Sequence, residues 1–351
     1  MIRNRCPDVV QFNLEPVGGM SVASITLPFY EPAFYTYNVY GSVTSMLSNN
    51  DKYLPWLYNN FIQIRYVEDW DSYFFDNHHT LLDNIPWINH HQIPRDILNR
   101  KWQSLTDFII ESLHSDYYLY FYVDRSYISV SKQYQQATHW HEIFVYGYDE
   151  RKRTFLVADN LADGKYIRTE CPAEEIEQGY YSIVSDNEFF KNVHLLSIRE
   201  EQDYSLQLDQ IAESIRRYLN SSITVDLSFK EKTLFGIKAV EYSIEKVKDK
   251  LHSAPFVQID RRAFHLFWEH KIIMLQRLRY LMELAILKPD DDVLERYTMI
   301  VNHHESLRNL VLKFNLNNDW KLLSRIEHQL HTYLQLESTL LYGVMNELDE
   351  H

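Results

Sequence analysis

The sequence predicts an α+β fold, with a mixed domain over residues 1–202 followed by an all-α helical domain over residues 203–351. Segments with period-two alternation and short hairpins dominate the first part of the chain, whereas apolar residues after about residue 203 recur only at helical spacing. The chain has 351 residues, which is more than one domain usually contains. Two domains are therefore expected.

The first domain is predicted to begin with a short helix. Apolar residues across 39–47 recur on one helical face, and Asn38 stands where an N-cap is expected. Two further helices are expected, over 95–114 and over 172–178, and the histidine pairs at 78–79 and 90–91 are expected in loops. Strands are expected over 61–67, 117–123, 140–148, 154–158, 165–168 and 193–198.

The second domain is predicted to contain five helices, because its apolar residues follow the 3.6-residue period and it has almost no strand signal. The expected helices cover 208–219, 237–251, 260–287, 291–314 and 318–348. This domain either packs over a cleft of the first domain or forms a homodimer.

A hairpin over 139–160 carries the strongest chemical signal of the sequence. Its first strand holds His141, and its second strand ends at Asp159. An imidazole oriented by a carboxylate is the base half of a nucleophilic site. The alternative is a structural histidine beside an aspartate that ends a strand.

Other histidine clusters are weaker candidates for a metal site. His139 lies on the same strand face as His141, His265 precedes Glu269 by one helical turn, and a further cluster covers 303–305. A metal site needs three or four converging ligands, and none of these clusters supplies them. The eight glycines form no phosphate-binding loop or dinucleotide fingerprint. No metal and no cofactor are therefore expected.

Composition narrows the class of protein. The net charge of −14 disfavours a nucleic-acid binder, because such proteins neutralise phosphates with basic residues. No run of about 18 apolar residues and no signal-peptide pattern is present, so no membrane association is expected. Cys6 and Cys171 are far apart, which favours a reducing compartment. These features predict a cytoplasmic protein.

A family resemblance joins several of these segments. In chain order they are YNVYGSVTSML, DYYLYFYVD, HEIFVYGYD, FLVADNLADGKY, FGIKAVEY and FWEHKIIMLQRLRYL. Across residues 25–345 the chain resembles the butirosin biosynthesis protein H family. Those proteins have a papain-like or C39-like domain of the cysteine-peptidase type, followed by a helical region, and they occur with antibiotic and nonribosomal-peptide assembly lines.

The resemblance implies acyl, aminoacyl or peptidyl transfer, or cyclisation, on a substrate held by a phosphopantetheinyl carrier protein, with a small-molecule amine as acceptor. It implies that His141 is the catalytic histidine and that Asp159 orients it. The family's cysteine nucleophile is replaced by Asn38, whose amide cannot form a thioester. The residues expected to contact the substrate are Tyr40, Ser42, His139 and Asn160.

Three hypotheses follow for the function. In the first, His141 is a general base for direct attack on a carrier-bound acyl group, and Asn38 donates a hydrogen bond to the developing oxyanion. In the second, the protein is a catalytically inactive accessory protein that binds a carrier protein or a synthetase. In the third, the similarity is architectural and the helical domain forms a dimeric scaffold.

Overall fold

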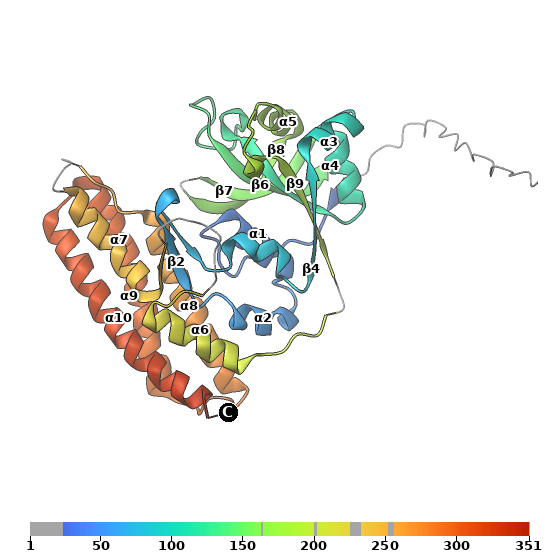
Figure 1. Ribbon diagram of the computed structural model, residues 1–351. Coiled ribbons are helices and arrows are strands. Elements are labelled where there is room, and N and C mark those ends of the chain that lie inside the picture. Colours follow the sequence, from blue (N-terminus) through green and yellow to red (C-terminus); the bar gives the residue numbers. More distant parts are fainter. Residues whose placement is uncertain (1–23, 163, 200–201, 225–232, 252–255, 351) are drawn as a thin grey trace, which may run out of the picture.

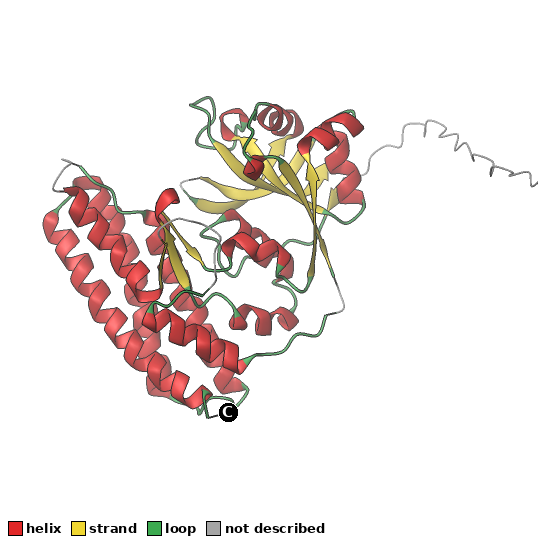
Figure 2. Ribbon diagram, viewed as in Figure 1, coloured by secondary structure: helices red, strands yellow, loops and turns green. Residues whose placement is uncertain are grey.

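The structure, a computed structural model, describes residues 24–162, 164–199, 202–224, 233–251 and 256–350 (Figure 1). Cys6 lies outside these ranges. Within them the protein is α+β, with antiparallel strands in the first part of the chain and long helices in the last part (Figure 2). This agrees with the fold class expected from the sequence.

The main sheet has the strand order β4-β9-β5-β6-β7-β8, and β1 pairs with the outer part of β6. Its strands are β1 Ile25–Thr26, β4 Ile88–Pro94, β5 Tyr118–Asp124, β6 Trp140–Asp149, β7 Thr154–Ala162, β8 Lys165–Pro172 and β9 Asn192–Ile198. The predicted hairpin is the pair β6 and β7, joined at Asp149 and Thr154. The expected loop at 90–91 is instead part of β4, where His91 pairs with Leu195 of a strand from much later in the chain.

Helix α1 (Asn38–Leu47) lies between the main sheet and the C-terminal helices (Figure 1). The sequence predicted one apolar face, but all ten residues of α1 are buried because it is covered on several sides. Gly41 is required here: a Cβ at this position would lie 2.6 Å from the ring of Tyr166. The glycine therefore lets β8 approach the first turn of α1.

Helices α4 (Leu105–His114) and α5 (Ala173–Tyr181) pack on β5, and α3 (Arg95–Lys101) precedes α4. The single helix expected over 95–114 is thus two helices. The break has a local cause, because the extended Ser104 accepts a hydrogen bond from Asp107 N at 3.0 Å and so caps a new helix.

The predicted boundary near residue 202 does not separate two independent structures. The hairpin of β2 (Ile64–Val67) and β3 (Ser72–Phe75) pairs with β10 (Thr233–Phe235), which belongs to the C-terminal half of the sequence. This small sheet packs on helices α7 (Gly236–Leu251) and α8 (Arg261–Glu283). The early hairpin is therefore part of the helical region in space.

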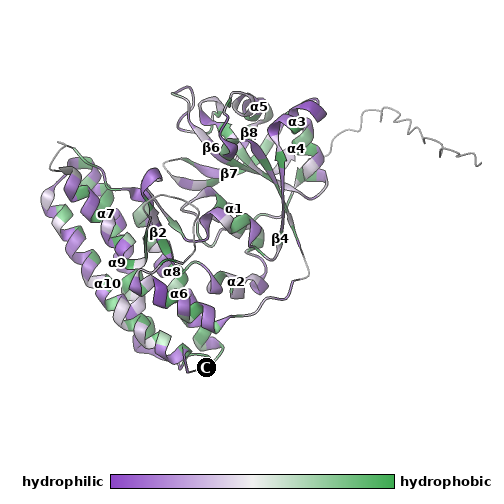
Figure 3. Ribbon diagram, viewed as in Figure 1, coloured by the Kyte–Doolittle hydropathy of each residue, from purple (hydrophilic) through white to green (hydrophobic). Residues whose placement is uncertain are grey.

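Five long helices follow residue 203 in the described ranges, as predicted. They are α6 Leu208–Asn220, α7 Gly236–Leu251, α8 Arg261–Glu283, α9 Asp291–Asn317 and α10 Trp320–Leu348. Hydrophilic and hydrophobic segments alternate along them, as in amphipathic helices (Figure 3). The remaining helical segments are α2 Leu54–Asn59 and the short 3-10 helices Asp51–Tyr53, Glu68–Trp70, His78–Asp83, Arg125–Tyr127 and Glu188–Phe190. Among the described helices, none is both long and apolar enough to cross a membrane.

A buried ionic cluster holds the helical region together. We call Tyr218, Lys271, Tyr297 and Glu337 the Glu337 cluster; its two charged side chains have no exposed surface. Glu337 accepts hydrogen bonds from Lys271 Nζ at 2.7 Å, from Tyr218 at 3.0 Å and from Tyr297 at 2.5 Å. The cluster thereby links α6, α8, α9 and α10.

Candidate active site

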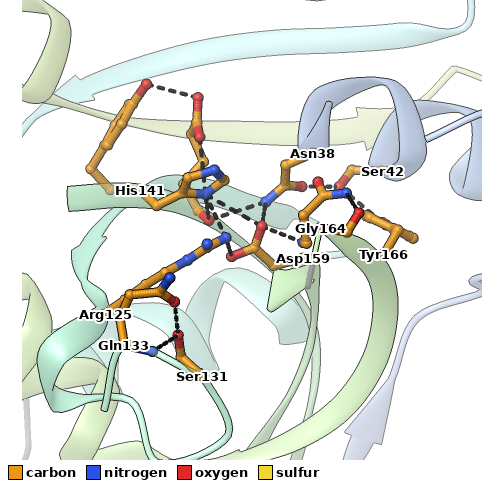
Figure 4. Close-up of polar contacts among 12 residues, drawn as sticks. Asn38, Ser42, Arg125, Ser131, Gln133, His141, Asp159, Gly164 and Tyr166 are labelled. Carbon is orange, nitrogen blue, oxygen red and sulfur yellow. Dashed lines mark hydrogen bonds and ion pairs between the residues drawn. The ribbon is translucent and has the colours of Figure 1, made fainter. Parts of the chain in front are cut away.

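The structure brings together Asn38, His141 and Asp159, the three residues for which catalytic roles were expected (Figure 4). Asn38 is the first residue of α1, His141 is near the start of β6, and Asp159 lies in the neighbouring strand β7. Helix α1 packs on both strands, which directs its first turn at the two side chains. The N-cap position itself is taken by Tyr37 rather than by Asn38.

Asp159 is the fixed centre of the site and has no exposed surface. Its carboxylate accepts from Asn38 Nδ2 at 2.9 Å, from the backbone N–H of Asn160 at 2.6 Å and from Arg125 Nη2 at 2.5 Å. Burial raises the pKa of Asp159, but the charges of His141 and Arg125 lower it by more, so its pKa lies below the usual value. Asp159 is therefore an anion in the interior.

His141 is held at one ring nitrogen. Its Nδ1 lies 2.7 Å from Arg125 Nη2, 3.2 Å from Glu142 Oε2 and 3.4 Å from Asp159 Oδ1. With Nδ1 protonated, the ring donates to the carboxylates; with Nδ1 bare, it accepts from Arg125. The hydrogen bonds and ion pairs of His141 among the described residues are all at Nδ1, which leaves Nε2 for a ligand.

The carboxylates also set the charge of His141. Burial lowers the pKa of His141, but Asp159 and Glu142 raise it by more, so the pKa lies above the ordinary value. The side chain keeps 27% of its surface exposed, so the ring is neither in the core nor free in solvent. A histidine that is held in this way beside a pocket can exchange a proton with a bound molecule.

Asn38 cannot act as the sequence hypothesis required. Its Nδ2 donates one hydrogen to Asp159 Oδ1 at 2.9 Å and the other to the carbonyl oxygen of Glu142 at 3.1 Å. Its Oδ1 accepts from Ser42 Oγ at 2.7 Å. Because both N–H groups are used, Asn38 has no donor left for an oxyanion; it positions Asp159 instead.

A pocket of about 430 Å³ opens beside His141, and we call it the His141 pocket. Two of the four predicted substrate contacts, His139 and Asn160, line it. The ring of His139 lies nearly parallel to that of His141, with centroids 6.0 Å apart. Asn160 is held by its Nδ2, which donates to Tyr35 O at 3.1 Å.

The other two predicted substrate contacts, Tyr40 and Ser42, do not line this pocket. Tyr40 is fully buried, and its hydroxyl accepts from Phe75 N at 3.2 Å. Ser42 is 1% exposed and lies behind Asn38, between that residue and Tyr166. Both residues lie on buried sides of α1, because the helix is covered beyond the single face expected.

Sequence reasoning missed two residues of the site. Strict period-two alternation along β6 puts Glu142 on the face opposite His141, but its carboxylate turns back to the imidazole and also accepts from Tyr122 at 2.7 Å. Arg125 follows β5, which pairs with β6 in the register Val123↔His141. The signal for Arg125 was a charged residue directly after a buried strand, which becomes informative once that strand pairing is known.

The remaining candidates for chemistry have structural contacts. Glu269 accepts from Tyr35 N at 2.6 Å, and His304 Nδ1 bonds to Ile300 O at 2.9 Å. Cys171 is buried outside the His141 pocket, and burial raises its pKa well above the ordinary value. Among the described residues, no group of three or more His, Cys, Asp or Glu is placed to hold a metal ion.

The described site thus combines a buried anion, a guanidinium and an oriented imidazole next to a pocket, with an amide where the resemblance places a nucleophile. This arrangement can hold and transfer a proton. Compared with known proteins, the chain matches no protein-family model, and no curated protein matches it.

Proposed function

We propose that this protein has a papain-like site without a covalent nucleophile and catalyses acyl transfer from a carrier-protein thioester to an amine. The observation that carries the proposal is the orientation of His141. Its Nδ1 lies 3.4 Å from the buried Asp159, 3.2 Å from Glu142 and 2.7 Å from Arg125, and its Nε2, at the edge of the His141 pocket, has no partner among the described residues. The base is the form in which Nδ1 carries the proton and donates to the carboxylates, because accepting from Arg125 would leave the proton on Nε2.

In the proposed reaction, His141 Nε2 takes a proton from the acceptor amine while the amine nitrogen attacks the thioester carbonyl. The C–N bond forms, the C–S bond breaks, and the imidazolium returns its proton to the departing thiolate. The products are an amide and a free carrier thiol. A thioester is reactive enough for direct attack, so no acyl-enzyme is needed.

Asp159 and Glu142 stabilise the imidazolium in the middle of this reaction, because both carboxylates lie within 3.4 Å of Nδ1. Arg125 keeps Asp159 ionised, and Asn38 fixes its position. In this mechanism Asn38 is a positioning residue.

A second candidate is an accessory protein that binds the carrier-held group without transforming it. The observation in its favour is that both N–H groups of Asn38 are used, while Tyr40 and Ser42 do not line the His141 pocket. The scaffold hypothesis has less support, because it requires His141 to be buried and this ring borders a pocket.

The test is intact-protein mass spectrometry of a loaded carrier protein with candidate amines. We expect wild-type protein to unload the carrier and His141→Ala to slow this by about 10²–10⁴-fold, the usual contribution of a general base. His91→Ala is the matched control, because His91 is exposed on β4 and lies outside the pocket.

An unchanged rate in His141→Ala would refute the enzymatic proposal. A carrier that stays loaded with wild-type protein but co-elutes with it from size-exclusion chromatography would support the accessory function.

A further inference from the structure

A second hollow adjoins the His141 pocket. It has a volume of about 420 Å³ and shares Thr36, Gly164, Arg261 and Arg262 with the His141 pocket. We call it the arginine groove, and its further lining includes Lys165 and Arg308. The shared residues border both hollows, so the two lie side by side.

The charge of the groove is opposite to that of the protein. The whole chain carries −14, yet four cationic side chains and no carboxylate among the described residues line the groove. Arg262 Nε lies 3.7 Å from Asp260 Oδ1 at the edge. Arg261, Lys165 and Arg308 form no ion pair within the described ranges. Four cations held together in an acidic protein attract an anion.

One of the four cations, Arg308, and the backbone at 35–36 are held by contacts within the protein. The guanidinium of Arg308 lies over the ring of Trp268, 4.6 Å from its centre, and its Nη1 is 3.1 Å from His265 Nδ1. The chain at 35–36 is fixed to α8 because Glu269 accepts both backbone N–H groups there. These contacts orient Arg308 and this part of the wall before any ligand binds, which reduces the entropy cost of binding there.

The uncharged part of the lining indicates what the anion is attached to. Tyr35 and Tyr166 present nearly parallel rings whose centroids are 6.4 Å apart, and Ile167 and Leu312 complete the lining. Guanidinium groups match the oxygens of a phosphate, and the aromatic and aliphatic surface suits an organic chain.

We propose that the arginine groove binds the phosphate of an organic phosphoester whose chain runs past Thr36 and Gly164 into the His141 pocket. If the proposed function holds, this phosphate is that of the phosphopantetheine arm, either on the carrier protein or as a free thioester; the identity of the chain rests on that function. The phosphate-binding role rests on the groove alone.

The test compares pantetheine 4′-phosphate with pantetheine by isothermal titration calorimetry. We expect the phosphorylated compound to bind about 10–100-fold more tightly, as charge-assisted hydrogen bonds predict. Arg262→Gln and Arg308→Gln should each remove most of this preference, and salt should weaken it. Arg279→Gln is the matched control, because Arg279 is exposed on α8, the helix of Arg262, and lies outside the groove.

A second arm uses carrier protein with and without its phosphopantetheine arm. If free pantetheine 4′-phosphate is preferred and the two arginine variants lose this preference, the groove binds the phosphate of a small molecule. If the preference appears only with the arm on the carrier protein and the same variants lose it, the groove binds the phosphate of the carrier's arm. Equal affinity with and without the phosphate in both arms overturns the inference, as does an equal loss in Arg279→Gln.

The two proposals fail separately. The binding measurement is repeated with His141→Ala, which lacks the proposed base but keeps every cation of the groove. Retained phosphate preference in this variant, together with absent transfer by the wild type, would refute the catalytic proposal and leave the groove supported.

Discussion

Two buried ionic clusters of this molecule have similar composition, but only one of them borders a pocket. The Glu337 cluster and the group around Asp159 each place a fully buried carboxylate against a cation and neutral donors. Among the described residues, the hydrogen bonds of Glu337 are with other buried side chains, and no residue of its cluster lines the His141 pocket or the arginine groove. The group around Asp159 instead ends in His141, at the edge of a pocket. A buried charge whose partners are all buried therefore indicates a structural role. A buried charge beside an unpaired ring nitrogen at a pocket indicates a chemical one.

The largest effect should come from the closed cluster. Lys271→Met leaves the Glu337 carboxylate buried without its cation, and we expect a loss of about 3–5 kcal/mol in the free energy of unfolding, measured by urea denaturation. The double variant Lys271→Met/Glu337→Gln removes both charges and should recover part of this loss. A cost below about 1 kcal/mol for the single variant would contradict the assignment of the cluster as structural.

Asp159→Asn should cost less, about 1–3 kcal/mol, because Arg125 also lines the pocket and can gain water there. The pKa of Asp159 is lowered in the folded protein, so its stabilisation is present above the unfolded pKa of about 3.9 and is lost as pH falls through the folded pKa. The difference between wild type and variant should therefore shrink in acid. Asp96→Asn, in an exposed pair with Arg100, should change stability by less than about 1 kcal/mol at any pH.

The smallest effect concerns protonation. Glu142 raises the pKa of His141, so Glu142→Gln should lower that pKa, as followed by the imidazole NMR signals of His141. A raised histidine pKa stabilises the fold below the unfolded value of about 6.5, and this contribution is lost as pH rises through the folded pKa. The variant should lose part of it.

The same variant makes a kinetic prediction. A general base must be neutral, so the rate of acyl transfer should rise with pH through the pKa of His141, and Glu142→Gln should move this rise to lower pH. Glu170→Gln, outside the pocket, serves as the control and should leave both the titration and the rate profile unchanged. If the pH dependence of the rate is the same in Glu142→Gln as in the wild type, Glu142 has no part in the proton transfer.

Local patterns in the sequence were sufficient to predict elements whose contacts lie between residues close together in the chain. The alternation around His141 predicts the β6–β7 hairpin, and helical spacing predicts the five long helices. The break at Ser104 also had a local signal, since Asp107 follows at the spacing of a capping box. That signal was outweighed by the continuous apolar face across 95–114.

Features that depend on distant pairing were not predictable. Thr233–Phe235 is too short to show a period, so its pairing with β2 could not be anticipated. Arg125 enters the site through the pairing of β5 with β6, and Glu142 through a side-chain rotation that alternation does not describe. The sequence could not show that both N–H groups of Asn38 donate within the protein, because the residue type alone suggests a free donor.

The small sheet that joins early and late segments also has a consequence for synthesis. The β2–β3 hairpin ends at Phe75, but its third strand begins only at Thr233. At a translation rate of about 5–20 residues per second, the hairpin waits on the order of ten to thirty seconds for that strand. During this interval an unpaired strand edge is exposed, together with Tyr73, whose ring later packs on Phe267 at 5.4 Å. The nascent chain is therefore expected to need chaperone protection until α8 has left the ribosome.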